Sequence, residues 1–211
     1  MSNELKGLFK FGGISFIVSG VLFFLKYLLD LIAGPPPSSG AEILTWTTAG
    51  KLPLAIGDEV LFFAAMFLVP AVIALYHHLA APDRTKAAVG CGIIAAAIPI
   101  LLVLDIFLGR LIYPVYKIIV DTPAVAELVV ALYYGGLHAV GIMLGVATLV
   151  LSLAMKRGGF GGSIAYLGLA AGAFDFIGAY PDSIGPVLVL LSQLLFAAWF
   201  IAVGAKLYRM P

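Results

Sequence analysis

Charged residues are scarce in this sequence. Asp, Glu, Lys and Arg make up 11% of the 211 residues, the net charge is +1, and 63% of the chain is apolar. An ordinary soluble domain carries about 25% charged residues and needs them to cover its surface. These values exclude a soluble domain, a disordered chain, a coiled coil and collagen. They predict a helical integral protein of the cell membrane, in contact with the lipid bilayer and without a nucleic-acid partner.

Cysteine is nearly absent as well. Cys91 is the single cysteine and lies in an apolar run, so the chain cannot form an internal disulfide and this thiol is expected in the core. The sequence also lacks a nucleotide-binding loop, a serine nucleophile elbow, a haem-binding histidine pair and a redox cysteine pair. The first apolar segment follows Lys6 and Lys10 as a signal peptide would, but its length favours a retained helix.

The apolar residues fall into six segments of spanning length. A spanning helix needs about 20 apolar residues. We therefore expect an all-α, polytopic membrane protein with six transmembrane helices in a single domain, residues 1–211. The segments cover residues 7–33, 54–80, 87–112, 124–156, 160–180 and 186–206. Two longer loops, residues 35–53 and 111–123, carry the aromatic side chains that suit a membrane interface.

The basic residues predict the orientation. Eight Lys and Arg residues lie at the two termini and in the loops around residues 84 and 156, whereas three lie on the opposite side. This bias places both termini in the cytoplasm. With that orientation, nine of the eleven acids lie in the outer loops, Asp182 among them, or in the outer half of the spans. Because a charge facing lipid costs on the order of 3 kcal/mol, most buried acids should face the bundle interior or an outward-open cavity.

The fourth segment gathers polar residues on one face. Glu127, Tyr134, His138, Gly141 and Gly145 lie within about 60° of one another at 100° per residue. The fifth segment has a similar face, which consists of Gly168, Ala171, Gly172 and Asp175. The glycines favour close helix packing, and the polar residues favour a shared outer space.

Simpler interpretations exist for several of these residues. Lys26 and Asp30 are four residues apart and would neutralise each other. Asp58 and Glu59 are neighbours about 100° apart, and of the two we expect Glu59 to face the interior. His138 alone would also suit a hydrogen-bonded core histidine.

A weak internal repeat relates the three outward-running segments. Each ends in an acid followed by apolar residues and a glycine, at Asp30, Asp105 and Asp175. This pattern suggests three related hairpins with one acid each. Membrane proteins use such repeats with the binding site between them.

Three stretches resemble a known family. They are Gly57-Asp58-Glu59-Val60-Leu61-Phe62, then Arg157-Gly158-Gly159-Phe160 with 166–172, and 193–204. Together they resemble an uncharacterised prokaryotic six-helix membrane family, a domain of unknown function. The resemblance implies the fold and the topology but no activity. Where that family often has an acid before the tryptophan of the last helix, this chain has Ser192 and Gln193.

We expect a membrane protein that binds, and transports, a small molecule or a cation in an outward-facing acidic cavity. The expected ligand-binding residues are Glu59, Asp105, Glu127, Tyr134, His138, Asp175 and Gln193. One alternative is an intramembrane metal-dependent hydrolase, although the chain has no HExxH spacing. Another is a non-catalytic subunit or assembly factor with a partner protein or a second copy. The sequence names no cofactor, metal or catalytic residue.

Overall fold

The computed structural model describes residues 3–180 and 184–210, so Asp182 lies outside the described residues. The described part consists of six helices and one isolated bridge between Val115 and Ile118. The helices are α1 (Asn3–Ala33), α2 (Gly40–Ala49), α3 (Lys51–Ile112), α4 (Pro123–Met155), α5 (Gly162–Gly178) and α7 (Pro186–Tyr208). The all-α prediction is confirmed.

Four of these helices, α1, α3, α4 and α7, are long and apolar enough to cross a membrane. Helix α5 is apolar too but has 17 residues, at the lower limit for a span. The helices therefore have the lengths and composition of a multi-pass membrane protein, as predicted.

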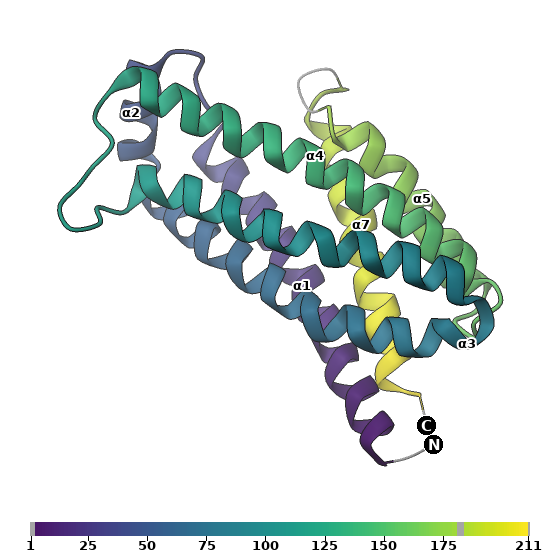
Figure 1. Cartoon of the computed structure of the whole chain (residues 1–211). Helices are drawn as coiled ribbons and strands as arrows, with labels where there is room; N and C mark the ends of the chain where they lie inside the picture. Colours follow the sequence, from purple (N-terminus) through teal and green to yellow (C-terminus); the bar gives the residue numbers. More distant parts are fainter. Residues whose placement is uncertain (1–2, 181–183, 211) are drawn as a thin grey trace.

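Helix α3 turns back on itself at Asp83. The backbone there leaves the helical region, with φ −155° and ψ 84°. Pro82 supplies no N–H to the helix before the break, and the Asp83 carboxylate accepts the Lys86 backbone N–H at 3.1 Å, which caps the helix after it. The two arms, residues 51–82 and 84–112, lie side by side (Figure 1). The break falls between the second and third predicted segments.

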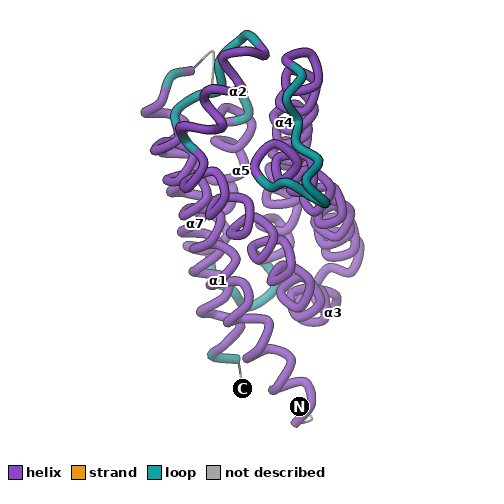
Figure 2. The backbone as a smooth tube through the Cα atoms, turned by 90° about the vertical axis from the view of Figure 1, so that its left-hand side faces the viewer, coloured by secondary structure: helices purple, strands orange, loops and turns teal. Residues whose placement is uncertain are grey.

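The helices pack in a closed ring that follows the chain. Helix α1 packs on α3, α3 on α4, α4 on α5 and α5 on α7, and α7 returns to α1. Figure 2 shows this bundle from the side, with both termini at the same end. The closure between α1 and α7 depends on two glycines, because a Cβ on Gly13 would lie 2.6 Å from the Gly204 carbonyl oxygen.

The short helix α2 was not predicted. Residues 35–53 were expected to form an interfacial loop, but the structure places Gly40–Ala49 in a helix packed on α4 and α3. Its buried residues are Gly40, Ile43 and Thr47. Trp46 ties α2 to α1, since its Nε1 donates to the Ala33 carbonyl oxygen at 2.9 Å.

Candidate functional site

A buried lysine lies near the centre of the polar residues. Lys26 on α1 is only 5% exposed, and its Nζ binds both carboxylate oxygens of Asp30 at 2.5 and 2.6 Å. The lysine stem passes Gly57 of α3, where a Cβ would lie 3.2 Å from the Lys26 Cδ atom. The predicted neutralising pair is therefore confirmed. It is formed inside the bundle, where an unpaired charge is costly.

Two further acids meet across the arms of α3. Asp58 is 4% exposed, and its carboxyl group lies within hydrogen-bonding reach of that of Asp105. Gly109 leaves room for this approach, because a Cβ there would lie 3.0 Å from Asp58 Oδ2. Among the described residues, the Oδ1 atom of each aspartate is buried and has no hydrogen-bond partner.

Helix α4 covers these residues with a tyrosine. Tyr133 is fully buried, its ring centroid lies 5.5 Å from Lys26 Nζ, and its hydroxyl has no hydrogen-bond partner within the described ranges. We call Lys26, Asp30, Asp58, Asp105 and Tyr133 the central cluster. It brings together one basic and three acidic side chains, so its acids outnumber its base when every group is ionised.

Asp58, rather than Glu59, belongs to this cluster, so the expectation that Glu59 faces the interior is wrong. Glu59 is exposed. The reason is the helical register, since Leu54, Asp58 and Leu61 share the buried face of α3. Glu59 still lies within electrostatic range of Asp105 at the edge of the cluster.

Tyr134 lies beside Tyr133, with its ring centroid 5.0 Å away, within electrostatic range of Lys26 and Asp30.

Two of the predicted residues on α4 have other partners. Glu127 accepts the backbone N–H of Gly40 at 2.6 Å and so holds the start of α2. His138 Nδ1 lies 2.6 Å from the Ala179 carbonyl oxygen, and its ring packs edge-on against Tyr180. The interpretation of His138 as a hydrogen-bonded packing residue accounts for these contacts.

Asp175 belongs to a separate polar group between α4, α5 and α7. It is 8% exposed and accepts a hydrogen bond from Ser192 Oγ at 3.0 Å. Gln193, the predicted residue, is half-buried, whereas Ser192 is fully buried. The sequence did not indicate Ser192, because a serine in an apolar helix is a common packing residue.

Three buried polar atoms in this region have no hydrogen-bond partner in the part of the chain that the structure describes. They are Asp175 Oδ2, Ser152 Oγ and Trp199 Nε1. The last two converge on Gly168, where any Cβ would overlap both of them. We call Ser152, Gly168, Asp175, Ser192 and Trp199 the α5 cluster.

The seven predicted residues thus do not share one cavity. Asp105 belongs to the central cluster, with Glu59 and Tyr134 at its edge. Glu127 contacts α2, His138 contacts Ala179, and Asp175 belongs to the α5 cluster, with Gln193 next to its Ser192. Within the described residues, 3–180 and 184–210, no hydrogen bond or ion pair connects the central cluster, the Glu127 contact with α2 and the α5 cluster to one another. Two cavities of about 550 and 530 Å³ are lined by none of the seven. The smaller is an apolar groove between the second arm of α3 and α4, with Gly92 open to its surroundings.

No group of three or more His, Cys, Asp or Glu side chains is placed to hold a metal ion within the described residues. The hydrolase alternative therefore gains no support from the geometry. Fold and site together define a multi-pass helical membrane protein with a buried acidic cluster. Comparison with family models, with curated proteins and with solved structures finds no match to this chain. The resemblance to the six-helix family stays a prediction.

Proposed function

We propose that this chain is a six-span membrane protein that binds a small cation, in the first place a proton, at Asp58 and Asp105. The binding would serve the transport of a small molecule or cation. The observation that carries the proposal is the approach of these two carboxyl groups inside the bundle, where the Oδ1 atom of each is buried without a hydrogen-bond partner among the described residues. Ionisable groups within membrane spans often mark ion pathways and proton relays.

The chemistry of the pair favours a proton. An ionised carboxylate only accepts hydrogen bonds. Two carboxyl groups can therefore form a hydrogen bond with each other only when one of them carries a proton. Lys26 supplies the positive charge within the central cluster and is bound to Asp30. Without a proton or another cation, Asp58 and Asp105 would be two like charges in a poorly solvated place, which is unfavourable. The unpartnered hydroxyl of Tyr133 supports the same site, since it is a free donor or acceptor beside these groups.

Six spans follow if each arm of α3 crosses the bilayer separately. Helix α5, at about 26 Å, nearly matches a hydrocarbon core of about 30 Å. The end of the bundle with both termini carries most of the basic residues, which favours a cytoplasmic location for that end in the cell membrane.

Cysteine labelling tests this topology in a Cys91→Ala background. An impermeant maleimide should label Asp121→Cys in intact cells, and Arg84→Cys only after permeabilisation.

The proton site is tested by infrared difference spectroscopy and by proton flux into liposomes. The wild type should show a protonated carboxyl band that disappears as the pH rises, and a dye-detected proton influx driven by an imposed potential. Asp58→Asn and Asp105→Asn should each remove the band and reduce the flux at least tenfold. Asp121→Asn is the matched control, because Asp121 is an exposed acid in a connecting segment.

The two measurements separate binding from transport. The shared proton would be refuted if the wild-type carboxyl band stayed unchanged in both Asp58→Asn and Asp105→Asn. A band that responds as expected, with flux equal in all variants, would keep the proton site and refute its role in transport.

A further inference from the structure

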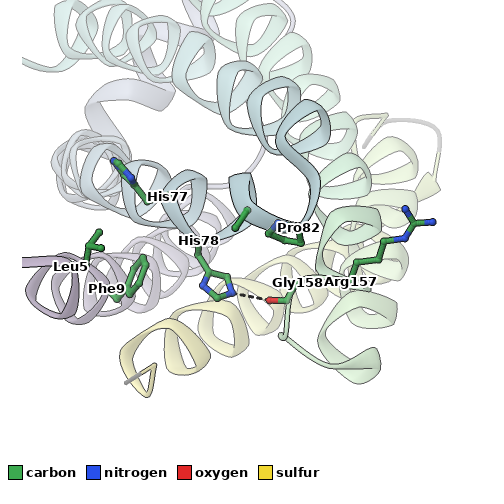
Figure 3. Close-up of a pocket in the computed structure, with 8 residues that line it drawn as sticks. Leu5, Phe9, His77, His78, Pro82, Arg157 and Gly158 are labelled. Carbon is green, nitrogen blue, oxygen red and sulfur yellow. Dashed lines mark hydrogen bonds between the residues drawn. The ribbon is translucent and has the colours of Figure 1, made fainter. Parts of the chain in front are cut away.

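The larger of the two cavities lies at the end of the bundle that carries the termini and the turn of α3. It has a volume of about 550 Å³ and is lined by residues of α1, the first arm of α3 and the α4–α5 connection (Figure 3). Its polar lining consists of His77, His78 and Arg157, and its apolar lining includes Leu5, Phe9 and Pro82. None of these residues belongs to the central cluster or the α5 cluster.

His78 is held in a defined orientation. Its Nε2 lies 2.7 Å from the Gly158 carbonyl oxygen, and because a carbonyl only accepts, Nε2 must carry the hydrogen. The rings of Phe9 and Phe160 pack edge-on against the imidazole, with centroids 5.8 and 5.2 Å away. With Nε2 as the donor to Gly158, Nδ1 is an acceptor in the neutral ring and donates to an anion only in the imidazolium form.

The hydrogen-bond donors around the pocket favour an anion. His77 and Arg157 are both exposed, and Figure 3 shows them on opposite sides of His78. The nearby acid, Asp83, is neutralised by an ion pair with Lys86. Arg157 is exposed and lies within electrostatic range of Asp83, and its guanidinium group can bind a phosphate with two parallel hydrogen bonds.

We propose that this pocket binds the phosphate headgroup of an anionic lipid, with its acyl chains along Phe9 and the neighbouring apolar residues. The joint presence of basic and apolar lining favours an amphiphile over a free phosphate ion. Basic pockets between membrane helices bind such headgroups in other proteins. The inference goes beyond the proposed cation site and does not depend on it.

The test measures lipid retention by native mass spectrometry of the full chain purified in detergent. The probes are phosphatidylglycerol and phosphatidylcholine with identical acyl chains. The wild type should retain phosphatidylglycerol at least fivefold better, and the variant with His77→Gln and Arg157→Gln should show no preference. The matched control combines Lys10→Gln with Arg209→Gln, which alters two exposed residues near the same end but outside the pocket lining. This control should retain the wild-type preference.

All four substitutions are at exposed positions, so the fold should tolerate them. Equal thermal unfolding midpoints of the variants and the wild type in phosphatidylcholine would verify this.

Two results would overturn the proposal. One is an equal loss of preference in the pocket variant and the control, which would indicate general attraction to positive charge. The other is thermal stabilisation by inorganic phosphate as large as that by phosphatidylglycerol, which would indicate a soluble ligand. Asp58→Asn should leave lipid retention unchanged, so the two proposals fail independently.

Discussion

The Lys26 ammonium group binds both carboxylate oxygens of Asp30, one helical turn further along α1, while its stem lies against Gly57 of α3. This arrangement places a positive charge among three acidic side chains. Asp58 and Asp105 lie within its electrostatic range as well. The stability of the bundle should therefore depend on this one lysine more than on any single acid around it.

Replacing Lys26 with Met should destabilise the protein by about 1–3 kcal/mol, because it leaves the half-buried Asp30 carboxylate without its partner. The measurement is unfolding in mixed detergent micelles, followed by circular dichroism. Lys10→Met on the exposed side of the same helix is the control and should change little.

The double variant Lys26→Met with Asp30→Asn separates charge from packing. It should recover at least half of the lost stability, because the unpaired carboxylate is gone. Equal stability of the single and double variants would show that Lys26 acts through the packing of its stem.

The sequence predicted the helices well because their apolar lengths determine them. Helix α1 ends at Ala33 and α7 begins at Pro186, as expected, and the break in α3 falls at Asp83 between two predicted segments. Helix α2 was missed because ten residues of mixed polarity carry no spanning signal. Helix α2 packs against α4 and α3, and such tertiary contacts cannot be predicted from the local sequence.

The candidate site was predicted less well, for a geometric reason. The sequence identified Asp105 and Asp175 as buried or half-buried acids in apolar helices, but not their partners. Asp105 meets Asp58 from the other arm of α3, and Asp175 meets Ser192 from α7. Such pairs depend on how the helices are rotated and ordered around the ring, and a single helix pattern does not determine either.

Gly168 should tolerate no larger residue. A Cβ at this position would overlap Ser152 Oγ and Trp199 Nε1, and the indole belongs to a fully buried side chain that has no space to move. Gly168→Ala should destabilise the protein by about 1–3 kcal/mol through overpacking. Gly135→Ala is the matched control, because nothing lies within 4 Å of the added carbon. Unfolding midpoints of the two variants that coincide would contradict the tight packing of the α5 cluster.

The turn of α3 should weaken in acid. Asp83 lies between the two apolar arms, and its hydrogen bonds from the Lys86 ammonium and backbone N–H lower the pKa of this carboxyl below its usual range. A lowered pKa in the folded state means that the ionised form contributes stability above the usual aspartate pKa of about 4. That contribution is lost as the pH falls through the lowered value.

Asp83→Asn keeps a capping side chain but removes the ion pair. Its unfolding midpoint should lie slightly below that of the wild type at neutral pH, and the difference should shrink as the pH falls below about 4. Asp83→Ala also loses the cap and should be less stable than Asp83→Asn at every pH. A wild-type advantage over Asp83→Asn that grows on acidification would show that the sign of this linkage is wrong.

Glu127 should hold α2 in place. The side chain of Ser39, which precedes α2, accepts no backbone N–H of the helix. The Glu127 carboxylate on α4 instead accepts the Gly40 backbone N–H at 2.6 Å. Negative charge at a helix N-terminus is stabilising, and a lost cap costs about 0.5–2 kcal/mol. Glu127→Ala should therefore speed hydrogen exchange of the amides in Gly40–Ala49 several-fold, with α7 unchanged as the internal reference. Asp121→Ala, which removes an exposed acid from the preceding segment, should leave α2 protected. Equal acceleration in both variants would mean that the overall charge of this end, rather than the Glu127 hydrogen bond, stabilises α2.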